Sequence, residues 1–287
     1  MHIVTDSGVD LSPQQRDGLD IHQLPLMITL DGKTYRSGID VQVDEFYDLL
    51  AASPNLPKTS MPSPGDFAEV YRELAKTDPE ILSVHISSGL SGTAESARVA
   101  AGMVEEAQVT LVDTLTLSAA QGWQVEAAAR AAKAGWPMAR ILELVRQVRE
   151  ATETVYTLPD LTYLIHGGRI SHMKGLLASM LKIAPLIGVS KTDGKYYMRG
   201  KKRGFSRALT ALVDVMAQDH AEGTKLRVQL VHINDPEGEA RLHEAIAARF
   251  ECEWLPTSTV APALGAHTGP GLVGVIYAAS AALPEMP

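Results

Sequence analysis

Short apolar segments alternate with longer segments of helical spacing through the first half of the chain. Ile3-Val4 precedes a polar run, and residues 81–86 and 108–112 have the apolar, β-branched character of two further strands. Between these two, residues 93–106 carry small apolar side chains on one helical face. Strands that alternate with helices predict an α/β fold with a mainly parallel sheet and helices on both faces.

Two further helical segments complete the first half. Residues 117–134 form an Ala-rich segment that stops at Gly135, and Trp136-Pro137 begins a helix that we expect to end near Thr152. We place the domain boundary there, giving an α/β domain at 1–152 and a smaller α+β domain at 153–287. In the second domain we expect a hairpin around Asp193-Gly194. Further helices are expected at 203–220 and 236–250, with strands at 226–233, near Cys252 and at 272–277.

The composition argues against several classes of protein. The formal net charge of -8 disfavours nucleic-acid binding, which needs a basic face. Cys252 is the single cysteine, so no intrachain disulfide forms, as is typical of a reducing compartment. The first residues lack a basic stretch followed by an apolar run, and residues 271–283 are too short to span a bilayer. We therefore expect a cytoplasmic protein.

The most specific local motif is Ser-Ser-Gly-Leu-Ser-Gly-Thr at residues 87–93. It follows a predicted strand and begins a predicted helix. Glycines allow close approach of the backbone to a ligand, free N–H groups at a helix start favour an anion, and serine hydroxyls add donors. The structural alternative is a capped helix start.

Three weaker segments add polar groups on stiff backbone. Three prolines within residues 57–64 hold Thr59 and Ser60 ahead of a helix that Ser63 caps. His267 lies between glycines in residues 261–271, on what we expect to be a rigid turn, and Arg169 follows a glycine pair. An imidazole and a guanidinium can both bind a carboxylate, but each residue also has a plain structural reading.

Basic side chains dominate residues 169–207. This segment contains ten lysines and arginines, and its only acid is Asp193. In an acidic protein such a segment predicts a docking surface for an acidic partner or an anionic membrane, and the alternative is a solvated face. The chain has no phosphate-binding loop, no His-Glu-x-x-His zinc motif and no dinucleotide fingerprint, so we predict no metal and no cofactor.

In combination, these motifs resemble the DegV family. The matching segments are Ile3-Val4-Thr5-Asp6-Ser7, Lys58-Thr59-Ser60-Met61-Pro62, residues 87–93, Val112-Asp113-Thr114, residues 167–171 and residues 265–271. The resemblance implies two α/β domains with a lipid between them. It also implies a long-chain fatty acid as ligand and a role as the fatty-acid-binding (FakB) subunit of a bacterial fatty acid kinase. A separate FakA-type kinase subunit would then phosphorylate the bound carboxylate for phospholipid synthesis.

The resemblance also assigns residues. Thr59, Ser91 and His267 match the carboxylate-binding network, and Arg169 matches the arginine beside it. Arg199, Lys201, Lys202 and Arg203 correspond to the region of kinase docking. Candidates for the acyl tail are residues 26–28, 176–177, 180–181 and 183–187, most of which we interpret as core.

Two other functions remain open. The first is a serine hydrolase of lipid-like esters with Ser91 as nucleophile and His267 as base, although residues 89–93 lack the last glycine of the Gly-x-Ser-x-Gly elbow. The second is a lipid store or transporter that acts without a kinase. The sequence does not specify the acyl chain length, its unsaturation or the oligomeric state.

Overall fold

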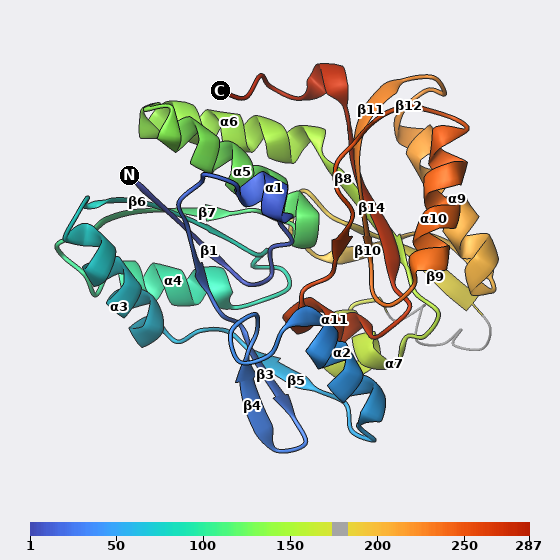
Figure 1. Cartoon of the computed structure of the whole chain (residues 1–287), viewed down its shortest axis with the longest axis horizontal. Coiled ribbons are helices and arrows are strands. Elements are labelled where there is room, and N and C mark those ends of the chain that lie inside the picture. The colour runs from blue at the N-terminus through green and yellow to red at the C-terminus, as the bar shows by residue number, and fades with distance from the viewer. Residues whose placement is uncertain (174–182) are drawn as a thin grey trace.

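A four-stranded parallel sheet organises the first half of the chain (Figure 1). We describe residues 1–173 and 183–287 of a computed structural model, so Lys174, Lys182 and the tail candidates at 176–177 and 180–181 lie outside the described residues. The strand order is β2 (Ile21–Leu24), β1 (His2–Asp6), β6 (Glu80–His85) and β7 (Gln108–Asp113). As predicted, the pairing is parallel throughout.

Helices cover both faces of this sheet, which confirms the α/β prediction. One face packs against α3 (Pro64–Ala75) and α4 (Thr93–Ala101), where Phe67 and Tyr71 are fully buried. The other face packs against α5 (Ser118–Lys133) and α6 (Met138–Ala151). Ser63 caps α3 in a reciprocal capping box with Asp66, as the sequence predicts.

The second half builds a larger, mixed sheet of seven strands. Its order is β10 (Tyr196–Arg203), β9 (Ile183–Val189), β8 (Glu153–Thr157), β14 (Val273–Ala279), β11 (Lys225–His232) and β12 (Glu251–Trp254), and β13 (Ser258–Thr259) pairs with β11. Helices α9 (Phe205–Asp219) and α10 (Pro236–Ala247) cover one face (Figure 1). The short elements are α1 (Pro13–Arg16), α7 (Thr162–Gly167), α11 (Pro262–Thr268) and the 3-10 turn Ser280–Ala282.

A small antiparallel sheet, absent from the prediction, lies below the other two in Figure 1. Its order is β4 (Lys33–Arg36), β3 (Met27–Leu30) and β5 (Lys58–Ser60), and α2 (Val43–Ala52) connects β4 to β5. The predicted stiff loop at 57–64 is therefore partly a strand, and Thr59 pairs with Ile28 in it. Prolines on both sides limit β5 to three residues, which leaves too short a pattern to recognise in the sequence.

Helix α5 lies between the two main sheets and is buried over nearly its whole length. Trp123 on this helix donates its indole N–H to Gln229 of β11 at 2.7 Å, and Gln229 in turn donates to Gln15. The chain leaves α6 and enters β8 at the predicted boundary between residues 152 and 153. The largest buried apolar cluster takes residues from both sides of that point, so the two halves share a core.

The predicted hairpin at Asp193-Gly194 also contacts the first half. Gly194 has a φ of +65°, and its carbonyl accepts a 2.9 Å hydrogen bond from Ser87 Oγ. A Cβ added to Gly194 would lie 1.8 Å from that hydroxyl oxygen. The turn therefore needs glycine for its backbone conformation and for the close approach of the 87–93 loop.

Gly194→Ala should destabilise the protein by roughly 2–4 kcal/mol, because left-handed strain is added to the displacement of Ser87. Gly135→Ala is a matched control, since Gly135 has a φ of +75° with no atom within 4 Å of an added Cβ. We expect that control to lose only about 1 kcal/mol. Urea unfolding of both variants is the measurement, and equal losses would contradict a specific turn–loop contact.

Candidate functional site

A cavity of about 170 Å³, partly open to solvent, lies where the small sheet, the 87–93 loop and α11 meet. The four predicted head-group residues Thr59, Ser91, Arg169 and His267 all line it, although they come from four different segments of the chain. The other lining residues are Leu26, Ser60, Met61, Ile86, Leu90, Gly92, Leu117, Tyr196, Ala263 and Leu264. No carboxylate or thiol lines this cavity within residues 1–173 and 183–287. Its donors suit an anion, and a single imidazole is a poor donor set for a metal ion.

His267 lies on a helix, which corrects the prediction of a turn. Pro262 occupies the first turn of α11, and the helix ends at Gly269, whose φ is +72°. This order, proline at the start and glycine just past the end, is a helix signal that the glycines around His267 obscured. A Cβ on Gly167 would lie 2.3 Å from His267 Nδ1, so α7 ends directly against the imidazole.

The imidazole of His267 is hydrogen-bonded and neutral. Its Nε2 lies 2.6 Å from Thr59 Oγ1, and its buried Nδ1 has no hydrogen-bond partner among the described residues. Burial, with smaller contributions from the neighbouring Arg169 and His166, lowers the pKa of His267 from 6.5 to about 4. At neutral pH the ring therefore acts as a hydrogen-bonding group without charge.

Ser91 lies at the amino end of α4. Its Oγ is 2.8 Å from Thr93 Oγ1 and accepts a longer bond from the Thr93 amide at 3.4 Å. Gly92, the N-cap residue of α4, makes no side-chain cap and lines the cavity. The structure describes no hydrogen bond between Ser91 and His267, so it gives no support to a serine–histidine hydrolase.

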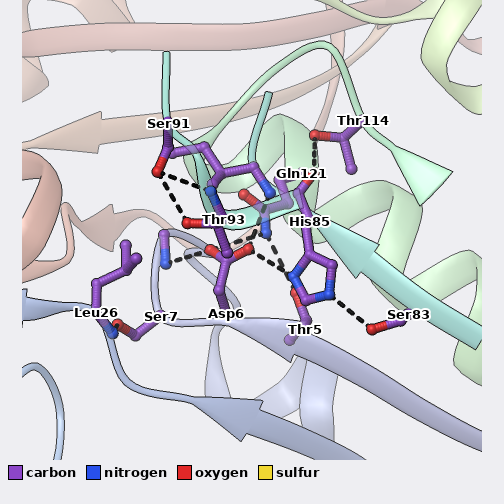
Figure 2. Close-up of polar contacts among 12 residues, drawn as sticks. Thr5, Asp6, Ser7, Leu26, Ser83, His85, Ser91, Thr93, Thr114 and Gln121 are labelled. Carbon is purple, nitrogen blue, oxygen red and sulfur yellow. Dashed lines mark hydrogen bonds and ion pairs between the residues drawn. The ribbon is translucent and has the colours of Figure 1, made fainter. Parts of the chain in front are cut away.

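A buried carboxylate fixes the start of the 87–93 loop (Figure 2). Asp6 Oδ2 accepts the Ile86 amide at 2.9 Å and lies 3.0 Å from His85 Nδ1, while Oδ1 accepts from the Gly8 amide and Gln121 Nε2. His85 Nε2 continues to Ser83 Oγ at 2.6 Å. These aspartate, histidine and serine side chains are completely buried, so this triad-like network orients the loop and cannot reach a substrate.

Arg169 reaches the same mouth from the loop after α7. Its Nε donates to the Leu90 carbonyl at 3.2 Å and its Nη1 donates to the Gly167 carbonyl at 2.7 Å. Nη2 makes no hydrogen bond to a described residue. The guanidinium is therefore held in place by main-chain acceptors and keeps donors for an anion in the cavity.

A second, apolar cavity of about 30 Å³ adjoins the first. The two cavities share Leu117, Tyr196 and Leu264. The remaining lining residues are Ser118, Thr154, Val155, Tyr156, Val231, Val260, Thr268, Leu272, Gly274, Val275 and Ile276. Of the tail candidates in the described part of the chain, Leu26 lines the polar cavity, and residues 183–187 line neither. The β8 and β14 residues were missed because their apolar runs are indistinguishable from core in a sequence.

The predicted docking residues lie on β10, at the edge of the larger sheet. Arg199 Nη2 donates to both carboxylate oxygens of Asp219, at 2.8 and 3.0 Å, and the Arg199 side chain is only 11% exposed. Lys201, Lys202 and Arg203 are exposed, and Lys202 Nζ lies 3.9 Å from Asp214. Arg199 therefore stabilises the fold, and three cations of the four remain on the surface.

The chain matches the model of the DegV family, described as uncharacterised proteins, over residues 1–280. It belongs to the DegV family. A DegV domain-containing protein of Lactococcus lactis, YejH, is 37% identical over 94% of this chain and 95% of its own length. No described helix is both long and apolar enough to cross a membrane.

Solved structures share the fold. A DegV-family protein from Thermus thermophilus, whose structure concerns fatty acid binding, superposes with a TM-score of 0.87 at 29% identity, covering 97% of this chain and 99% of that one. The fatty acid kinase B3 protein of Streptococcus pneumoniae, loaded with linoleic acid, has a TM-score of 0.82 at 20% identity, covering 98% of this chain and all of its own. At that identity the likeness shows the fold alone.

Lipid-free protein should lose stability as the pH falls from about 6.5 toward 4. In this window the unfolded imidazole of His267 binds a proton that the folded one, with its lowered pKa, does not. His267→Gln removes this contribution, so the unfolding free energy of the variant should fall less over this window than that of the wild type. The difference between the two should be at most about 3 kcal/mol. Urea unfolding at both ends of the window tests this, with His243→Gln on α10 as control. Identical pH dependence in wild type and His267→Gln would contradict a neutral, buried imidazole.

Proposed function

We propose that this DegV-family protein binds one long-chain fatty acid, with the acid group in the polar cavity and the tail directed into the apolar cavity beside it, whose lining side chains would have to move apart to admit the chain. The observation that carries the proposal is that a polar and an apolar cavity lie side by side and share Leu117, Tyr196 and Leu264 in their walls. One end offers hydroxyl, imidazole and guanidinium donors, and the other is lined almost wholly by apolar side chains. The fatty-acid-binding relative from Thermus thermophilus supports the same ligand class.

The two ends of the site contribute differently to binding. Each methylene that leaves water contributes about 0.8 kcal/mol, so roughly a dozen give ~10 kcal/mol before the costs of association. The carboxylate loses hydration in the cavity and needs donors in return. Thr59, Ser91 and Arg169 supply these, and neutral His267 orients the Thr59 hydroxyl. The tail thus supplies affinity while the head group supplies orientation.

The finer part of the proposal is that the protein presents this carboxylate to a FakA-type kinase and is not itself an enzyme. Hydroxyl donors hold one carboxylate oxygen without neutralising its charge, which leaves the other oxygen able to attack a phosphoryl group. Lys201, Lys202 and Arg203 are the docking candidates, since all three are exposed on an edge strand of an acidic protein. The same cations could instead contact an anionic membrane.

Loss of a head-group hydroxyl should weaken lipid retention. In Ser91→Ala and Thr59→Val we expect about tenfold faster exchange of bound fatty acid, since a hydrogen bond to a charged group contributes about 1.5–3 kcal/mol. Mass spectrometry of extracted lipid and exchange of a fluorescent fatty acid are the measurements.

Two matched controls come from the same segments. Ser88 is an exposed serine of the 87–93 loop, and Thr34 is an exposed threonine of the small sheet; neither lines the cavity. Ser88→Ala and Thr34→Val should retain lipid as the wild type does. Unchanged exchange in both Ser91→Ala and Thr59→Val would contradict the head-group assignment.

Charge reversal on β10 should separate docking from lipid binding. With purified FakA-type kinase, ATP and oleate, the wild type should form acyl phosphate. The triple change of Lys201, Lys202 and Arg203 to Glu should reduce that rate at least about tenfold without changing lipid content. Lys225→Glu, on β11, is the control. If the wild type forms no acyl phosphate, the kinase role is wrong and a lipid store is the better description.

A further inference from the structure

Two histidines and an aspartate converge at the amino ends of β1 and β2, at the opposite end of the strands from the cavity. His2 begins β1, and Asp20 immediately precedes β2, which contains His22. Because β1 and β2 are parallel, with Val4 opposite His22, both histidines project from the same face of the sheet. Their rings are 5.4 Å apart and nearly perpendicular.

The contacts of Thr77 favour one tautomer of His2. The Thr77 hydroxyl donates its one proton to the Leu74 carbonyl at 3.0 Å. Thr77 Oγ1 then accepts from His2 Nε2, which lies 2.9 Å away. With the proton on Nε2, the lone pair of a neutral His2 is on Nδ1. This is the arrangement in which an outer hydrogen bond orients a metal-binding imidazole.

One ring nitrogen of each histidine faces the Asp20 carboxylate. His2 Nδ1 lies 3.8 Å from one oxygen of Asp20, and His22 Nε2 lies 3.3 Å from the other. Both nitrogens are buried and have no hydrogen-bond partner among the described residues, although the Asp20 side chain is 75% exposed. In the tautomers that leave these two nitrogens unprotonated, their lone pairs face the carboxylate, and a cation between the three groups would satisfy them all.

We propose that His2, Asp20 and His22 bind a divalent transition-metal ion such as Zn²⁺. All three ligand atoms lie within 4.8 Å of one another. Ligands at about 2.0–2.2 Å from a tetrahedral Zn²⁺ are about 3.3–3.6 Å apart, so the three side chains need to approach one another only slightly. Two imidazoles select zinc, nickel or copper over the oxygen-preferring magnesium and calcium. Water takes the fourth position.

Such an ion would tie the segment before β2 to the first residue of β1. It is remote from Thr59, Ser91 and His267, so its role is to stabilise the sheet edge. The inference is therefore independent of the proposed lipid function. Loss of the metal should leave fatty acid content unchanged.

Titration calorimetry with ZnCl₂ on protein without a polyhistidine tag tests the site. The wild type should bind one ion per chain, and its Tm should rise with Zn²⁺. Asp20→Asn, an exposed change that leaves the core intact, and His22→Gln should each weaken binding at least about tenfold. Asp17→Asn and His243→Gln are controls for the lost charge and for the lost imidazole, and both should bind as the wild type does.

A second readout identifies the ligands. Co²⁺ in the wild-type site should give the intense visible absorption of a four-coordinate ion, and Asp20→Asn and His22→Gln should lose it. Wild-type protein that binds no Zn²⁺ would overturn the proposal. Binding that survives in both variants would also overturn it, because the ion would then be held elsewhere.

Discussion

The candidate site depends on one buried carboxylate. An ionised group taken out of water is costly unless its lone pairs are satisfied. Asp6 meets that requirement with backbone amides from the loops after β1 and β6 and with side chains from β6 and α5. These contacts bring the carboxyl ends of two parallel strands and the central helix to one point, and the 87–93 loop begins there. The position of Ser91 therefore follows from Asp6.

Much of the fold could be predicted from local pattern. The parallel sheet, α3 with its cap, the end of α5 at Gly135 and the hairpin at Asp193-Gly194 all have short-range signals that the structure confirms. The small sheet could not be predicted, because β5 has three residues between prolines and its partner strand is thirty residues earlier in the chain. The turn predicted at His267 was wrong because glycines within and after α11 masked a proline-started helix.

The site was harder to predict than its individual residues. Motifs pointed to Thr59, Ser91, Arg169 and His267, but only the fold brings them around one cavity. The tail cavity had no usable signal, since residues of β8 and β14 that face a space are the same types as residues that face a core. Arg199 was the opposite case. A run of basic residues predicts an exposed surface, but the sequence does not reveal that Arg199 forms an ion pair with Asp219.

The contact between Ser87 and Gly194 links two surfaces that would otherwise be separate. Ser87 begins the loop that bears Ser91, and Gly194 forms the turn from which the exposed strand β10 departs. The turn and the loop pack closely, because any side chain at Gly194 would clash with Ser87. A displacement of that edge strand would therefore be transmitted to the loop that bears Ser91.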